Sequence, residues 1–164
     1  AYKLREKDPI ASKKSNQGGW QSLDFDVNDS DDILHNLLIN CIKKFPRFKN
    51  NVYAFMDAWV NINKTGDYNV THDHPDCDLS GVLWVKAPKD CGDIVFDSPV
   101  GFQTYREVNS YRDDFKRENA IFKSYYYTPK EGRILMFPSY LKHDVKKNIS
   151  QEDRISVSFN IRLE

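Results

Sequence analysis

The segment RISVSFNIRL, residues 154–163, decides the fold that this sequence predicts. Apolar residues occupy every odd-numbered position from Ile155 to Leu163, and polar residues occupy the positions between them. This period of two predicts a β-strand with one apolar and one polar face. The polar face has two interpretations. It faces solvent on an antiparallel sheet, or it lines a water-filled cavity inside a jelly roll while the apolar face packs under a helix.

Five earlier segments share a composition rich in β-branched and aromatic residues, and clusters of Gly, Pro, Asn and Asp separate them. They are Val52–Asn63, Ser80–Lys86, Asp93–Phe96, Ile121–Thr128 and Arg133–Phe137. The sequence lacks the alternation of strands and helices that indicates a parallel sheet. We therefore expect a mainly β protein whose core spans residues 52–163 and forms an antiparallel sandwich or barrel.

One helix is predicted, over residues 30–44. Ser30 is a favourable N-cap, aspartates follow it in the first turn, and lysines occupy the last turn. Six apolar residues recur at helical spacing: Ile33, Leu34, Leu37, Leu38, Cys41 and Ile42. This stripe predicts that the helix covers one face of the β core. The histidine within it, His35, is expected to be a packing or surface residue.

Two segments lie outside these elements. Residues 1–28 are polar and rich in turn formers, and we expect an N-terminal arm laid over the domain. Residues 101–120 form a charged insertion between strands, and its length makes it a candidate lid. The total of 164 residues predicts a single domain spanning residues 1–164.

Composition excludes several classes of protein. Basic and acidic residues number 24 each, so the basic surplus typical of nucleic-acid-binding proteins is missing. No apolar run approaches the roughly 20 residues of a membrane-spanning helix. Three cysteines without zinc-site spacing favour a reducing compartment. We therefore expect a cytoplasmic protein that binds neither nucleic acid nor membrane, and the oligomeric state stays open.

Three of the four histidines predict a metal site. His72 and His74 are two residues apart, and on a strand such residues point the same way. His143 follows about 70 residues later, and three imidazoles form a plausible set of ligands for iron, manganese, nickel or zinc. Arg154 comes eleven residues after His143, and Ser156 shares its strand face.

Three stretches together resemble a known enzyme family. They are residues 72–82, 132–143 and 154–161, and they are similar to 2-oxoglutarate/Fe(II) oxygenases of a branch related to prolyl hydroxylases. The earlier SNQGGWQS, residues 15–22, resembles an N-terminal signature of that branch. The resemblance covers roughly residues 10–163. The branch occurs in bacteria and marine phages, which extends the expected location to the cytoplasm of an infected host.

The resemblance implies a double-stranded β-helix, the jelly roll that cupins share, with iron near one mouth. It implies a dioxygenase that uses Fe(2+), 2-oxoglutarate and O₂ to hydroxylate a peptide or a small molecule. His72, His74 and His143 match the iron ligands. Arg154 and Ser156 match the residues that hold the 5-carboxylate of 2-oxoglutarate, for which the arginine fork is suited. The resemblance therefore favours the cavity interpretation of residues 154–163.

Asn61 is a further candidate contact to the co-substrate. It alternates with Trp59 and Asn63, opposite an apolar set on the same strand, which predicts that it faces the cavity. Trp59 itself is expected to pack in the core or at the rim.

Two positions depart from the family pattern. His74 stands where the broader superfamily usually has a carboxylate ligand, so either His74 binds the metal or Asp76 or Asp78 does so in its place. Trp84 stands where related hydroxylases often carry a tyrosine that helps to hold the co-substrate.

Two other functions stay open. The spacing of Gly66, His72 and His74 also follows the first cupin motif, which would indicate a metal-dependent isomerase or a dioxygenase that needs no 2-oxoglutarate. A jelly-roll binding module without catalytic activity is the third possibility, and it leaves the histidine motifs unexplained. The pair Arg154 and Ser156 favours the oxygenase, because the cupin pattern does not require it.

Overall fold

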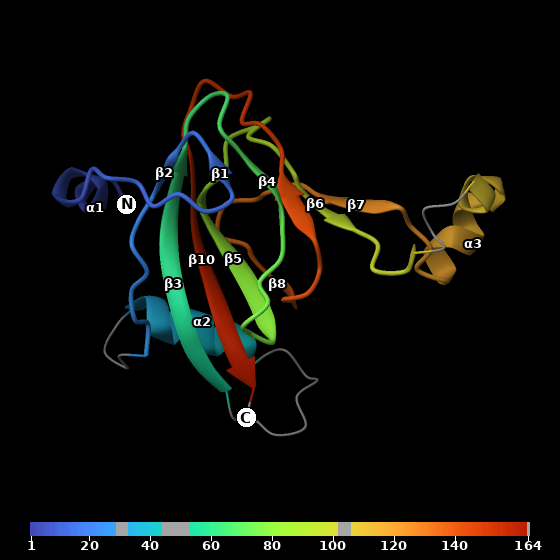
Figure 1. The fold of residues 1–164 in the computed structure, drawn as a ribbon, viewed down its shortest axis with the longest axis horizontal. Helices are drawn as coiled ribbons and strands as arrows, with labels where there is room; N and C mark the ends of the chain where they lie inside the picture. The colour runs from blue at the N-terminus through green and yellow to red at the C-terminus, as the bar shows by residue number, and fades with distance from the viewer. Residues whose placement is uncertain (29–32, 44–52, 102–105, 164) are drawn as a thin grey trace.

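The computed structural model describes residues 1–28, 33–43, 53–101 and 106–163, and its strands form two five-stranded antiparallel sheets (Figure 1). The first sheet has the order β1 (Asn16–Gln17), β4 (Tyr68–His72), β9 (His143–Val145), β6 (Ile94–Asp97) and β7 (Ser124–Tyr127). The second has the order β2 (Trp20–Gln21), β3 (Tyr53–Asn63), β10 (Arg154–Leu163), β5 (Leu79–Lys86) and β8 (Ile134–Pro138). The two sheets are the layers of a jelly roll, which confirms the predicted fold.

Strand β10 lies at the centre of the second sheet, between β3 and β5. Its apolar residues from Ile155 to Ile161 belong to the main hydrophobic core, and Phe159 is completely buried. Its polar residues from Arg154 to Asn160 line an internal cavity on the opposite face of the sheet. The alternation in sequence therefore corresponds to core on one face and cavity on the other, as predicted.

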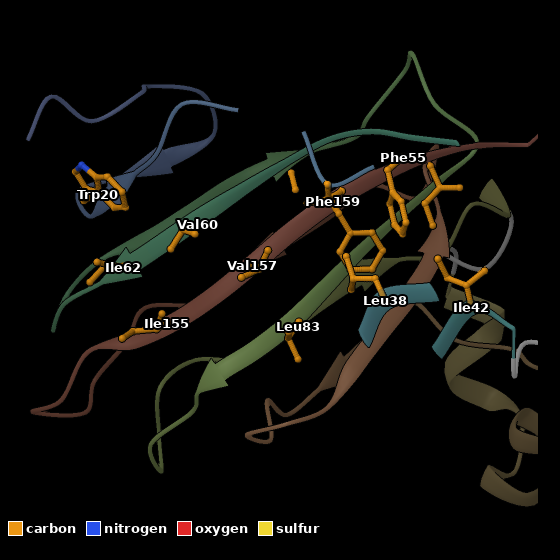
Figure 2. Close-up of a cluster of buried hydrophobic side chains, with 13 residues drawn as sticks. Trp20, Leu38, Ile42, Phe55, Val60, Ile62, Leu83, Ile155, Val157 and Phe159 are labelled. Atoms are coloured by element: carbon orange, nitrogen blue, oxygen red, sulfur yellow. The ribbon is translucent and has the colours of Figure 1, made fainter. Parts of the chain in front are cut away.

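Helix α2 (Ile33–Ile42) covers the apolar face of the second sheet. Figure 2 shows Leu38 and Ile42 directed from this helix toward Phe159, and all three side chains are buried. Leu34 packs with them, so the contact follows residues spaced four apart. The predicted stripe is too wide, because Ile33 is 86% exposed and Leu37 is also exposed. The predicted N-cap lies outside the described residues.

The N-terminal arm is more ordered than the sequence predicts. It begins with helix α1 (Tyr2–Lys7), and its two short strands then join different sheets. Strand β1 pairs with β4 of the first sheet, and β2 pairs with β3 of the second. Gly18 and Gly19 connect them at φ values of +73° and +71°, a left-handed backbone that favours glycine. The arm therefore bridges the two sheets beside the cavity.

The insertion lies away from the second sheet, beyond β6 and β7 (Figure 1). Its described part contains the 3-10 helix η2 (Arg106–Ser110) and helix α3 (Asp113–Glu118) rather than irregular chain. None of its described residues lines the cavity, so the structure gives the lid hypothesis no support. In the described part of the chain, no helix has the length and apolarity needed to cross a membrane.

The other predicted strands match observed ones to within a few residues. The largest difference is the predicted segment Ile121–Thr128, which shortens to β7 because only its central residues pair with β6. Strands β4 and β9 are not predicted from the sequence, although they carry two of the three candidate ligands.

Candidate metal centre

Three imidazoles meet at one end of the cavity, and we call His72, His74 and His143 the histidine cluster. His72 ends β4 and His143 begins β9, where the two residues are paired across the antiparallel ladder. His74 lies in the turn beyond β4, and its backbone N–H donates to the carbonyl of Ser139 at 3.0 Å. The turn, rather than strand alternation, brings His74 to the other two.

The three rings are close enough to share one ion. Their potential ligand atoms lie within 4.8 Å of one another. Ring centroids are separated by 4.3 Å for His72 and His143, by 5.2 Å for His72 and His74, and by 5.4 Å for His74 and His143. Among the described residues, this is the group of His, Cys, Asp or Glu side chains positioned to hold a metal ion.

Backbone carbonyls orient two of the rings. The Nδ1–H of His72 donates to the carbonyl of Val70 at 2.8 Å, and that of His143 donates to the carbonyl of Leu141 at 2.8 Å. This bond at Nδ1 leaves Nε2 as the nitrogen that can bind a metal, an arrangement typical of metal-binding histidines. In this structure the Nε2 of His72 accepts a hydrogen bond from the Ser15 hydroxyl. His74 is held differently, because its ring stacks on Trp59 with centroids 5.9 Å apart. Trp59 is therefore a buried residue that also forms part of the cavity wall.

Burial keeps the histidine cluster uncharged. Burial, together with the smaller effect of the neighbouring His72, lowers the pKa of His74 to about 4 and that of His143 to about 4. Burial also lowers the pKa of His72. At neutral pH the imidazoles are therefore in the deprotonated form that binds metals.

The aspartates proposed as alternatives to His74 lie elsewhere. An Asp78 carboxylate oxygen accepts a hydrogen bond from the backbone N–H of Leu163 at 2.8 Å, and Asp76 is exposed to solvent. Neither belongs to the group that could hold a metal. The acidic residue that does line the cavity is Asp73, whose negative charge raises the pKa of His72 and His74 against the effect of burial.

Arg154 lies farther along the same cavity and is 2% exposed. One of its terminal nitrogens, Nη1, donates to the carbonyl of Cys91 and, at 3.3 Å, to that of Gly92. Burial lowers its pKa to about 10, so it stays charged at neutral pH. No Asp or Glu in the described ranges lies within ion-pair distance of it. A buried cation without an anionic partner is costly, which makes the adjacent cavity a site for an anion.

A row of cavity-lining side chains crosses the second sheet next to Arg154. Strand pairing places Gln21 beside Asn61, Asn61 beside Ser156, and Ser156 beside Trp84. The Asn61 amide donates to Ser158 Oγ at 3.2 Å. Along the direction of the strands, this row lies between Arg154 and Trp59, the residue on which His74 stacks.

The cavity has a volume of about 260 Å³. The structure brings all six sequence-predicted site residues to its wall: Asn61, His72, His74, His143, Arg154 and Ser156. It adds residues that sequence reasoning missed, of which Lys14, Ser15 and Gln21 come from the N-terminal arm. The Ser15 hydroxyl reaches within 3.3 Å of His72 Nε2. The signature-like residues 15–22 were the signal that could have revealed this contribution.

The fold and the cavity together define a jelly-roll protein with a candidate non-haem metal centre. The sequence identifies the family, because residues 57–160 match the family described as "Putative 2OG-Fe(II) oxygenase". The chain therefore belongs to the 2-oxoglutarate/Fe(II)-dependent oxygenases, enzymes that use Fe(2+), 2-oxoglutarate and O₂. The predicted family, enzyme class and cofactors are confirmed, and the roles of individual site residues stay predictions.

Solved structures share the fold at low sequence identity. A Pseudomonas putida prolyl-4-hydroxylase is 13% identical, with a TM-score of 0.59 over 99% of this chain and 84% of that one. A viral collagen prolyl hydroxylase from Paramecium Bursaria Chlorella virus-1 is 16% identical, with a TM-score of 0.59 over 99% and 87% of the two chains. HygX from Streptomyces hygroscopicus, solved with nickel and 2-oxoglutarate, is 8% identical, with a TM-score of 0.61 over 98% and 77%. None of the curated proteins compared with this chain matches it in sequence.

Proposed function

We propose that this oxygenase is a hydroxylase of a peptide or a small molecule. In this proposal the histidine cluster holds Fe(2+), and Arg154 with Ser156 holds the distal carboxylate of 2-oxoglutarate. The observation that carries the proposal is the presence of three neutral imidazoles at one end of the cavity and, farther in, a buried guanidinium that makes no ion pair with a described residue.

The residues of the histidine cluster fit a divalent iron. Nitrogen ligands on one side of an ion leave positions open on the other, as in non-haem iron oxygenases. Bound Fe(2+) would supply the activation of O₂ that this family uses. Three imidazoles bring no negative charge, so the metal attracts an anionic co-substrate more strongly than a site that contains a carboxylate ligand. Asp73 at the cavity wall supplies a negative charge near the metal site, although it does not belong to the histidine cluster.

The order of the groups along the sheet suits 2-oxoglutarate. Arg154 and Ser158 are four residues apart on β10, or about 13 Å along a strand, and Ser158 is paired with Trp59 beside His74. This spacing exceeds the length of a five-carbon chain, so the Arg154 side chain would have to reach toward the histidine cluster to hold the co-substrate. A linear dicarboxylate with one end near the histidine cluster therefore directs its other carboxylate toward Arg154. The guanidinium fork and the Ser156 hydroxyl would donate to that carboxylate. The Asn61 amide already donates to Ser158, so we assign it a supporting contact.

A proline-containing peptide is one candidate substrate, because two solved structures with this fold are described as prolyl hydroxylases. Lys14 and Asp73, both exposed and both at the cavity, would present opposite charges to such a chain. The cupin-type alternative is less well supported, because it gives no reason for a buried Arg154.

The test is turnover of 2-oxoglutarate. The iron-loaded protein should convert 2-oxoglutarate and O₂ to succinate and CO₂, and a true substrate should gain one oxygen atom by mass spectrometry. His143→Ala should abolish succinate formation. His35→Gln is the matched control, because His35 lies outside the cavity and bonds the carbonyl of Val27. A protein with full iron occupancy that forms no succinate would contradict the proposal.

A further inference from the structure

Gln21 of the N-terminal arm has an unusual environment. Its side chain is 2% exposed and lines the cavity. Its amide nitrogen Nε2 is buried and has no hydrogen-bond partner. Native proteins leave few buried donors unpaired, because such a donor loses its bonds to water and gains nothing in return. The Nε2 of Gln21 is therefore a donor available to an acceptor bound in the cavity.

The position of Gln21 indicates where that acceptor lies. Antiparallel partners place their side chains on the same face of a sheet, so Gln21, Asn61 and Ser156 point into the cavity together. Arg154 is two residues before Ser156 and is paired with Asn63 in the adjacent row. Along the direction of the strands, Gln21 therefore lies between Arg154 and the histidine cluster.

The arm holds Gln21 firmly in this place. Its neighbour Trp20 is buried in the hydrophobic core, and the indole N–H donates to the carbonyl of Asp8 at 2.9 Å. A Cβ added at Gly19 would lie 2.7 Å from the Asn63 side chain, so the turn that feeds β2 fits closely against β3. The unpaired amide is thus a constrained donor rather than a side chain free to turn toward solvent.

The chemistry of the cavity wall points to an anionic acceptor. Asp73 is the one acidic residue among the described side chains that line the cavity, and it neighbours the histidine cluster rather than Arg154. An amide donor that lines the same cavity as a buried guanidinium suits a carboxylate, since hydrogen bonds to an ionised acceptor are the stronger kind.

We propose that Gln21 donates a hydrogen bond to the distal carboxylate of 2-oxoglutarate, and is thus a co-substrate-binding residue supplied by the N-terminal arm. This inference rests on the proposed function. Gln21 lies outside residues 57–160, the part of the chain that matches the family. The arm therefore completes the co-substrate site as well as bridging the two sheets.

The test compares two ligands by anaerobic calorimetry on the Fe(II)-loaded protein. Gln21→Met keeps the length of the side chain and removes the donor, so 2-oxoglutarate affinity should fall about tenfold or more. Affinity for oxalate should not change, because oxalate chelates the metal and lacks the distal carboxylate. Gln17→Met is the matched control on the same arm, since Gln17 is exposed, and it should bind both ligands like the parent.

Thermal unfolding without co-substrate separates binding from a structural role. Gln21→Met should unfold at the same or a higher temperature than the parent, because it removes an unpaired buried donor. Gln21→Glu should bind 2-oxoglutarate more weakly still, since it places a second anion beside the carboxylate. Equal 2-oxoglutarate affinity in the parent and both variants would overturn this inference and leave the proposed function intact. An equal loss of oxalate binding would also overturn it. A parent that binds iron but no 2-oxoglutarate would instead contradict the proposed function.

Discussion

Replacing Arg154 with lysine tests the charge and the geometry of the anion site separately. The lysine keeps a cation but has no planar fork, so it cannot present two parallel donors to one carboxylate. In the structure Nη1 already donates to the carbonyls of Cys91 and Gly92. A lysine ammonium must divide its hydrogens between those carbonyls and the co-substrate. Loss of one charge-assisted contact costs about 1.5–3 kcal/mol, or roughly a 10- to 150-fold loss of affinity.

The assay is anaerobic calorimetry of 2-oxoglutarate with the Fe(II)-loaded protein. Arg154→Lys should lose affinity by this factor and should keep its iron, because Arg154 does not contact the histidine cluster. Arg162→Lys is the matched control, since Arg162 lies on the same strand and is exposed. The burial that lowers the pKa of Arg154 to about 10 also lowers the pKa of a lysine at this position. The 2-oxoglutarate affinity of the variant should therefore fall further as pH rises above neutrality and the lysine loses its charge. Equal affinity in Arg154→Lys and the parent would refute the anion-site assignment.

Three further predictions follow from the same structure. His74→Ala should lose most of the bound metal by elemental analysis while Asp78→Ala retains it, and the reverse result would place the third ligand downstream of His74. The metal-free protein should lose stability in denaturant titrations as pH falls from about 6.5 to about 4, because the unfolded chain binds protons at His74 and His143 that the folded chain does not. A free energy of unfolding that does not change over this pH range would contradict the burial of the two histidines. Gly81→Ala should destabilise the fold by about 1–3 kcal/mol in urea unfolding, since the added Cβ would meet the ring of the buried Phe159 at 2.2 Å, and an unchanged midpoint would count against this packing.

The sequence predicts the second sheet well because its long strands have a buried face. Residues 154–163 alternate strictly, and a one-residue shift would turn Phe159 into the cavity and Arg154 into the core. The prediction that Asn61 faces the cavity, opposite its apolar neighbours on the strand, is confirmed for the same reason. Strands β4 and β9 are short and half-exposed, so their composition carries little signal even though they position His72 and His143.

The rest of the site depends on contacts between segments that are distant in sequence. His74 joins the histidine cluster through a turn held by the carbonyl of Ser139, and no local pattern predicts that contact. Gln21 enters the cavity because the arm pairs with β3, which composition alone does not indicate. Trp59 is buried, as expected of a packing residue, but the sequence does not predict that it stacks on His74 at the cavity wall.

The central claim is that one cavity binds Fe(2+) through the histidine cluster and 2-oxoglutarate through Arg154. The most direct measurement is an anaerobic optical titration of 2-oxoglutarate into the Fe(II)-loaded protein. Chelation of the metal by the keto acid should produce a weak visible charge-transfer band that saturates with one equivalent and that His143→Ala does not show. A fully iron-loaded protein that gives no band and no calorimetric binding would contradict the account.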